Sequence, residues 1–302
     1  MQGSTPSDKS DRPIIIVGCP RSGTRLLARL IGGSDSHFLI TEHANKERSC
    51  PEDVSGINDT VLWWENFEYY LWDQRTSRPV VETPIYDRDQ IHRVRSIYIE
   101  HAKTKRLVLK NPAHLTRIRF LKEMFSNAFF VFCLRNPWHT LQSMVAKGNK
   151  AFLLKTFGNN VLPDDLLFRA AFSWSEAIEI YLRESDENWV LVKYEDLVVH
   201  ARESIRTLFD VLSIADEEYF EKAVNLPEVK NRDYSHIRKL FQENNYKSSI
   251  IRAIEPGCKL FAYPLSIDEV DRMILRENSN KMKNRSGIFD FGKRLTRYIK
   301  RA

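Results

Sequence analysis

Four short runs of apolar residues are spaced along the chain and predict strands. Each run is nearly continuous in Ile, Val, Leu or Phe and does not alternate with polar residues, which is typical of strands covered on both faces. The runs therefore predict a parallel sheet buried between helices. They are Ile14–Val17, Arg106–Leu109, Phe129–Leu134 and Trp189–Val192.

Between these runs, apolar residues recur at the spacing of one face of an α-helix. Strands that alternate with helices predict an α/β domain of three layers, a P-loop-like fold in which helices flank a central parallel sheet. The helical stripes are Leu26, Leu27, Leu30 and Ile31; Leu167, Ala170, Ala171, Trp174, Ile178 and Tyr181; and Ile205, Leu208, Phe209 and Leu212.

The remaining segments suggest the organisation of the chain. Residues 1–12 are polar and predict a disordered leader, and residues 13–277 predict a single domain. Within that domain, the aromatic-rich stretch of about 43–80 predicts a helical insertion, although a plain core helix would explain the same aromatic side chains. Residues 278–302 form a basic tail.

Charge is concentrated in that tail. The chain of 302 residues carries a net charge of +6, and residues 278–302 hold eight Lys or Arg against one acid. The tail thus carries +7 and the rest of the chain −1, so the body is not expected to coat nucleic acid. Phe291, Leu295, Tyr298 and Ile299 have helical spacing, which would allow the tail to pack on the body or to lie in the headgroup layer of an anionic membrane.

The cysteines and the hydropathy indicate a cytoplasmic protein, with the tail offering a peripheral contact at the inner membrane surface. No run approaches eighteen apolar residues, so no membrane-spanning helix is predicted. The spacing of the four cysteines, Cys19, Cys50, Cys133 and Cys258, contains no CxxC pair and indicates neither a disulfide framework nor a zinc site.

The most informative segment is the loop between the first predicted strand and the helix that follows it. Its sequence, VGCPRSGTRLL, has glycines at Gly18 and Gly23. Such a loop wraps backbone N–H groups around a phosphate at a helix N-terminus. A P-loop would read GxxxxGK[ST]. Here Thr24 replaces the lysine and Arg25 the hydroxyl residue that would hold Mg²⁺, so an anion site without a metal is predicted.

Cations end the other predicted strands. Lys110, Arg135 and Lys193 follow their strands directly, where a magnesium-dependent phosphotransferase would place an aspartate. Ligands of open α/β sheets bind beyond the carboxyl ends of the strands. Together with Arg21, these residues predict a doubly phosphorylated anionic cofactor. Glu195 and Asp196 are expected to begin the next helix, where they favour the helix dipole.

At four blocks the chain resembles the PAPS-dependent sulfotransferases, especially bacterial members and tyrosylprotein sulfotransferases. The blocks CPRSGTRLL, LVLKNPAHL, FVFCLRNPWHTLQSM and VKYEDL occur in the family's order. The resemblance implies transfer of a sulfuryl group from PAPS, with release of PAP. The family's glycine-rich RKG-like phosphate contact has no clear counterpart here. The implied donor-binding residues are Arg21, Ser22, Gly23, Thr24, Arg25, Arg135, Ser143 and Tyr194. Among them, Arg135 and Ser143 have the spacing of the family's pair that binds the 3′-phosphate.

Sulfuryl transfer requires charge stabilisation and a base. Arg21 is expected to stabilise the departing 5′-phosphate, and Lys110 to reach the transferred sulfonate. Two residues are candidates for the base that takes the acceptor proton, Glu42 and His114, and the resemblance suggests both. Either one could instead be structural, so the sequence leaves the base open.

Two other functions remain as alternatives. A P-loop kinase would need the missing GK[ST] and a strand-end aspartate. A non-catalytic nucleotide-binding or RNA-binding protein would need stacking aromatic residues amid basic ones on the body. The resemblance leaves the acceptor undefined, and a small molecule, a glycan or a lipid would each present a hydroxyl or an amine.

Overall fold

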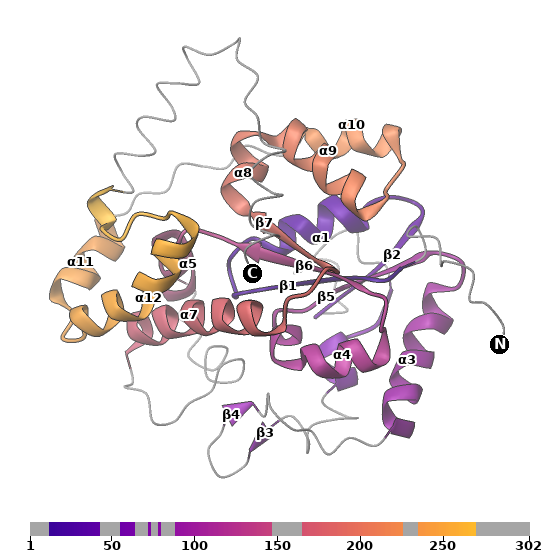
Figure 1. Cartoon of the computed structure of the whole chain (residues 1–302), viewed down its shortest axis with the longest axis horizontal. Helices are drawn as coiled ribbons and strands as arrows, with labels where there is room; N and C mark the ends of the chain where they lie inside the picture. Colours follow the sequence, from indigo (N-terminus) through magenta and orange to yellow (C-terminus); the bar gives the residue numbers. More distant parts are fainter. Residues whose placement is uncertain are drawn as a thin grey trace.

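The centre of the protein is a sheet of five parallel strands (Figure 1). The computed structural model describes residues 12–42, 55–63, 72–73, 78–79, 88–146, 165–225 and 235–269. The strands are β1 (Ile14–Gly18), β2 (His37–Thr41), β5 (Arg106–Lys110), β6 (Phe129–Leu134) and β7 (Trp189–Lys193). Their order is β2-β5-β1-β6-β7. The predicted α/β fold and the four predicted strands are confirmed.

The edge strand β2 is absent from the prediction. Its sequence, HFLIT, holds only three consecutive apolar residues between His37 and Thr41, too few to stand out. Pairing with β5 makes it a strand, with Phe38 opposite Leu107 and Ile40 opposite Leu109. Ile40 is fully buried, so the strand is fixed by tertiary packing more than by its own pattern.

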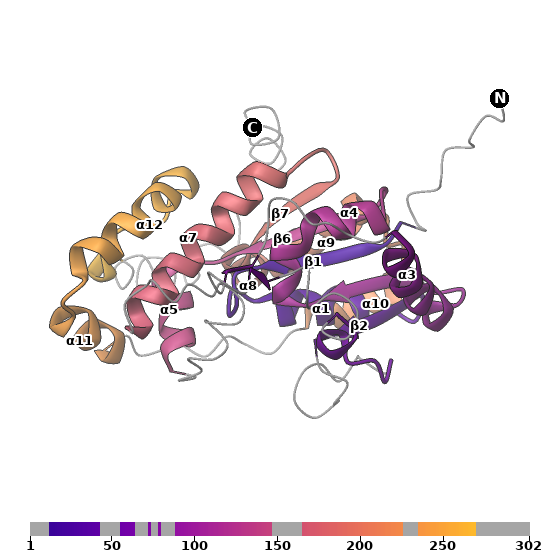
Figure 2. The same cartoon turned by 90° about the horizontal axis from the view of Figure 1, so that it is seen from below.

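Helices cover both faces of the sheet (Figures 1 and 2). Alternate residues of β1 face the two sides of the sheet. Ile14 and Ile16 pack against the helices on one side, and Ile15 and Val17 against those on the other. One layer contains α1 (Thr24–Gly32), α8 (Tyr194–Val199), α9 (Ala201–Leu212) and α10 (Glu217–Val224). The other contains α3 (Arg88–Ala102), η2 (Pro112–Arg117), α4 (Ile118–Met124), α5 (Pro137–Val145), α7 (Leu166–Glu184), α11 (Ser235–Glu243) and α12 (Lys247–Phe261).

The predicted helical stripes are the buried faces of α1, α7 and α9. In α9 all four residues of the predicted stripe are buried, and in α7 only Tyr181 is partly exposed. Tyr181 nevertheless stacks on Phe132 of β6, with ring centroids 4.6 Å apart. The 3.6-residue period therefore identified the faces that pack on the sheet.

Much of the predicted insertion, the leader and the tail lies outside the described residues. Within the insertion, residues 59–63 are helical, and β3 (Trp72–Asp73) pairs antiparallel with β4 (Arg78–Pro79). Arg12, assigned to the leader from the sequence, belongs to the body: its guanidinium lies 3.8 Å from the centre of the Phe129 ring. Among the described helices, none has the length and apolar character needed to cross a membrane.

Candidate functional site

The registers of the parallel strands bring the candidate residues to one edge of the sheet. Lys110 at the end of β5 pairs with Ile16 of β1 on one side and Thr41 of β2 on the other. Gly18 of β1 pairs with Cys133 of β6, and Leu134 pairs with Lys193 of β7. The carboxyl ends of these strands carry, or lead directly into, the glycine loop, Lys110, Arg135 and Tyr194. Ligands of α/β folds bind at such strand ends.

The loop after β1 folds sharply and opens into α1. The backbone of Arg21 has a φ of +70° and that of Gly23 a φ of +115°, both in the left-handed range. The Ser22 N–H donates to the Cys19 carbonyl at 3.0 Å, which closes the turn. The first turn of α1, beginning at Thr24, carries no acidic residue. Its N-terminus therefore retains the positive dipole end that favours an anion.

Tyr194 of α8 closes one side of this loop. A Cβ atom added to Gly23 would lie 2.3 Å from Cδ2 of Tyr194, so the position requires glycine for space as well as for backbone conformation. The Arg135 guanidinium lies 4.2 Å over the Tyr194 ring, within cation–π range. Tyr194 thus links the loop to the arginine that follows β6.

Gly23→Ala is expected to lower the free energy of unfolding by about 2–4 kcal/mol, because backbone strain adds to overpacking. Gly56→Ala is the matched control, since Gly56 has a φ of +71° but no atom within 4 Å of its added Cβ. That variant should lose only about 1–2 kcal/mol. Urea unfolding measures both. Equal losses would show that Tyr194 does not crowd the loop.

Arg21 connects the loop to both residues of the predicted 3′-phosphate pair. Its Nε donates to Ser143 Oγ at 3.1 Å, and an Arg135 terminal nitrogen donates to the Arg21 carbonyl at 3.3 Å. Arg135 and Ser143 are only 5% and 4% exposed. The structure therefore brings together Arg21, Arg135 and Ser143, which are far apart in the sequence.

Arg21, Ser22, Arg135 and Ser143 together form a cradle at the end of the sheet. Two of its buried polar atoms have no hydrogen-bond partner among the described residues. They are Ser22 Oγ and Arg135 Nε. A buried polar group without a partner is costly, and such groups in native folds mark places that a ligand, a water or an ion satisfies. One is a hydroxyl and the other a cationic donor, so the pair fits the oxygens of phosphate groups.

The segment after β6 is held rigidly. The Trp174 indole nitrogen donates to the Arg135 carbonyl at 2.9 Å. The Asn136 side chain caps α5 by accepting from the Trp138 N–H at 3.0 Å, and the Asn136 N–H donates to the Glu195 carboxylate at 2.9 Å. As expected, Glu195 lies in the first turn of α8, where burial raises its pKa. These contacts hold the main chain at Arg135 and Asn136 in place.

Lys110 and Glu42 form an ion pair at the end of β5. The Lys110 ammonium donates to both Glu42 oxygens, at 2.5 and 2.7 Å. Thr41 pairs with Lys110 across the sheet. The next residue, Glu42, is therefore close enough to contact the Lys110 ammonium. The Lys110 side chain is 4% exposed and that of Glu42 is 14% exposed. Of the two candidate bases, Glu42 therefore has access from solvent.

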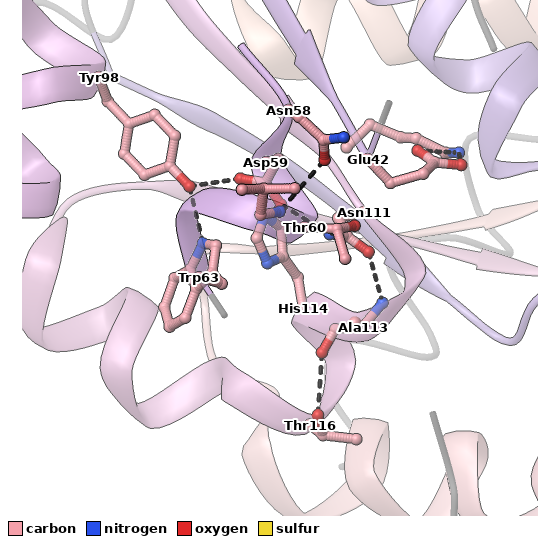
Figure 3. A network of polar contacts seen from close by, with 12 residues as sticks. Glu42, Asn58, Asp59, Thr60, Trp63, Tyr98, Asn111, Ala113, His114 and Thr116 are labelled. Atoms are coloured by element: carbon pink, nitrogen blue, oxygen red, sulfur yellow. Dashed lines mark hydrogen bonds and ion pairs between the residues drawn. The ribbon is translucent and has the colours of Figure 1, made fainter. Parts of the chain in front are cut away.

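His114 is enclosed in η2. It is fully buried, its Nε2 lies 3.4 Å from an Asp59 carboxylate oxygen, and its ring meets Trp63 edge-on at 5.6 Å between centroids (Figure 3). Burial lowers the pKa of His114 to about 4, although the neighbouring Asp59 acts to raise it. His114 is thus neutral near pH 7 and shielded from solvent in this structure.

The buried carboxylate beside His114 was not predicted from the sequence. Asp59 is 1% exposed and accepts hydrogen bonds from Tyr98 and Asn111 (Figure 3). An aspartate at a helix start normally indicates a solvated cap. Tyr98 could have been found, since Ile91, Val94 and Tyr98 have the spacing of a buried helix face.

Lys193 and Arg25 do not lie with the other predicted cations of the site. The Lys193 ammonium donates to the Phe261 carbonyl at 2.7 Å and lies 5.1 Å over the Tyr263 ring, so it connects β7 to the end of α12. We expected Lys193 to converge with Lys110 and Arg135, but its contacts are with the residues at the end of α12 instead.

Arg25 is exposed on α1, whereas Thr24 is buried. In the described part of the chain, no three His, Cys, Asp or Glu residues are grouped as metal ligands would be.

Two sulfotransferases are similar to this chain in sequence. The omega-hydroxy-beta-dihydromenaquinone-9 sulfotransferase of Mycobacterium bovis is 24% identical over 80% of this chain and 71% of its own length. A protein-tyrosine sulfotransferase of Caenorhabditis elegans is 26% identical over 67% of this chain and 50% of its own.

Solved structures show the same fold. The sulfotransferase domain of a Synechococcus olefin synthase has a TM-score of 0.50 and 16% identity, covering 88% of this chain and 100% of that domain. The sulfotransferase domain from the curacin biosynthetic pathway has a TM-score of 0.52 and 17% identity, covering 84% and 99%. The sequence profile of the Sulfotransferase family matches residues 13–218. The chain belongs to the sulfotransferase family.

Proposed function

We propose that this protein transfers a sulfuryl group from PAPS to a hydroxyl of an acceptor, releases PAP, and needs no metal ion for the transfer. The observation that supports this most directly is the cradle of Arg21, Ser22, Arg135 and Ser143. Two of its buried polar atoms have no hydrogen-bond partner within the described part of the chain. Two separate groups of donors suit a nucleotide that carries phosphates at two positions, as PAPS does.

The donor site has two parts in this proposal. Ser22, Gly23 and Thr24 offer backbone N–H groups at the N-terminus of α1 to the 5′-phosphate, and Arg21 adds a cation. Arg135 and Ser143 hold the 3′-phosphate. Tyr194 keeps Arg135 in place through their cation–π contact, and its proposed role is to contact the adenine ring. Arg25 is exposed on α1, and its proposed role is a longer-range attraction of the anion.

PAPS supplies a sulfuryl group joined to a good leaving group, the 5′-phosphate. As the acceptor oxygen forms its bond to sulfur, the bond between sulfur and the phosphate oxygen breaks and negative charge builds on that phosphate. Arg21 and the loop N–H groups stabilise this charge. The Lys110 ammonium stabilises the sulfonate oxygens, and Glu42 takes the acceptor proton. Preorganised donors of this kind account for much of the rate gain in group transfer.

The class of acceptor is proposed from the relatives. Their names specify an omega-hydroxy compound and a protein tyrosine, and each of these carries a hydroxyl. A hydroxyl acceptor, on a small molecule, a lipid or a glycan, is therefore favoured over an amine. Mass spectrometry of products formed with PAPS from a panel of such acceptors would identify it.

The donor assignment is tested by thermal shift with PAP, AMP and ATP–Mg²⁺ at matched concentrations. PAP should raise Tm most, because only PAP carries the 3′-phosphate that Arg135 and Ser143 would bind. Chelation with EDTA should leave the shift by PAP unchanged. Equal shifts with PAP and AMP would contradict the donor site, and a larger shift with ATP–Mg²⁺ would favour the kinase alternative.

A further inference from the structure

A buried polar cluster that the proposed chemistry does not use lies near Glu42, at the edge of the sheet where the strands end (Figure 3). Its centre is Asp59, at the start of the helical residues 59–63. One carboxylate oxygen accepts from the Tyr98 hydroxyl on α3, and the other accepts from the Asn111 amide at 2.6 Å. The Tyr98 hydroxyl in turn accepts from the Trp63 indole nitrogen at 2.7 Å. A carboxylate buried to this degree requires such donors.

Asn111 has the most informative place in this cluster. It immediately follows Lys110, at the point where β5 ends and η2 begins. Its side-chain oxygen accepts from the Ala113 N–H at 2.9 Å and so caps η2, while its amide nitrogen faces Asp59 and, at 3.3 Å, Thr60. Both ends of the Asn111 amide are therefore occupied, which leaves the side chain a single orientation.

Asn111 adjoins Lys110, whose main chain also pairs with β1 and β2. Asn111 is 3% exposed and its backbone is extended, with φ of −146° and ψ of 125°, which continues the direction of β5. Lys110 itself is held at its far end by Glu42. A change in the anchor of Asn111 would shift the start of η2 and, with it, the main chain that carries the Lys110 ammonium.

We propose that Asp59 is a positioning residue, which acts through Asn111 to hold Lys110 and its partner Glu42 in place for group transfer. This inference rests on the proposed function, because it assigns Lys110 and Glu42 to the reaction. It adds a residue that touches neither donor nor acceptor in the proposal. A displacement of about 1 Å at a reacting group can cost about 100-fold in rate.

The first variant is Asp59→Asn, which has nearly the same shape but offers one acceptor oxygen in place of two. One of the contacts to Tyr98 and Asn111 must then be lost or reversed. The expected result is a 10- to 100-fold slower breakdown of PAPS with water as acceptor, measured as release of ³⁵S-sulfate, with an unchanged Kd for PAP. Water as acceptor makes the assay independent of the natural substrate.

Tyr98→Phe is the matched control. It removes a different hydrogen bond of the same carboxylate and leaves Asn111 and His114 untouched. It should lower Tm while PAPS breakdown stays within about 2-fold of the unmodified protein. If Tyr98→Phe slows PAPS breakdown as much as Asp59→Asn does, the effect is general loosening of the core and the proposal is overturned.

The exchanged pair Asp59→Asn/Asn111→Asp tests the path of action. In this double variant the amide faces the carboxylate again, and an aspartate at position 111 can still cap η2. Asn111→Asp alone would set two carboxylates against each other and should be the slowest variant. The double variant should recover most of the rate. Failure to recover, in a folded variant that binds PAP, would overturn action through Asn111.

Two further measurements keep the test decisive. If Asp59→Asn does not fold, Asn111→Ser takes its place, because serine still caps η2 but is too short to reach Asp59; it should slow PAPS breakdown by the same 10- to 100-fold, and an unchanged rate would overturn the proposal. If the unmodified protein neither binds PAP nor breaks down PAPS, the proposed function fails. If it does both and Asp59→Asn matches its rate, only the positioning role of Asp59 fails.

Discussion

Replacing Arg135 by alanine is expected to remove the preference for PAP over AMP. Arg135 is 5% exposed, its Nε has no partner among the described residues, and the resemblance assigns it to the 3′-phosphate. A hydrogen bond to a charged group is worth about 1.5–3 kcal/mol, which corresponds to a roughly 10- to 150-fold weaker Kd for PAP. AMP lacks the 3′-phosphate, so its affinity should change much less. Isothermal titration calorimetry measures both affinities.

Two other variants make this result specific to the pair. Ser143→Ala removes a neutral hydroxyl and should weaken PAP by only about 3- to 10-fold. Arg95→Ala, at an exposed position on α3, changes the net charge equally and should have little effect. If Arg135→Ala weakened PAP and AMP by the same factor, Arg135 would act only by maintaining the loop, through its hydrogen bond to the Arg21 carbonyl.

The fold was predictable because burial leaves a clear pattern in most of its elements. Strand β6 (Phe129–Leu134), for instance, is buried along its whole length, and every residue in it is apolar. Strand β2, at the edge of the sheet, was not predicted because its pattern is weaker. Its end residues are His37 and Thr41, both buried polar residues, and their places depend on contacts with other segments. His37 Nδ1, for instance, lies 2.5 Å from the Ile31 carbonyl.

Some residues of the candidate site could likewise be predicted from the sequence, and others could not. The loop around Gly23 and the residues at the strand ends have local signatures, since the chemistry of an anion site requires glycines and cations in a fixed order. Asp59 and the contact of Lys193 with Phe261 have none. Each depends on a partner about 50 or more residues away, and a single sequence does not show which polar residues meet inside the fold.

Glu42→Gln is expected to lower turnover by about 10²–10⁴-fold on the acceptor identified by product mass spectrometry, because it removes the base while preserving its shape. Glu42 is the candidate base that solvent reaches, and it contacts the Lys110 ammonium. Loss of a carboxylate near an anionic donor should leave the Kd for PAP unchanged or tighten it. A fall in turnover therefore could not arise from weaker donor binding, which calorimetry with PAP would verify.

His114→Asn is the comparison that decides between the two candidate bases, because His114 is fully buried and its pKa is lowered to about 4 by that burial. Between pH 4 and 6.5 the unfolded chain binds a proton that folded His114 does not, so stability falls as pH drops through this window and is unaffected above it. His37, whose pKa burial also lowers to about 4, contributes in the same direction. His114→Asn should therefore flatten the pH dependence of urea unfolding and keep turnover at pH 7.5 within about 10-fold. A loss of turnover that matched or exceeded that of Glu42→Gln, with PAP binding intact, would instead identify His114 as the base.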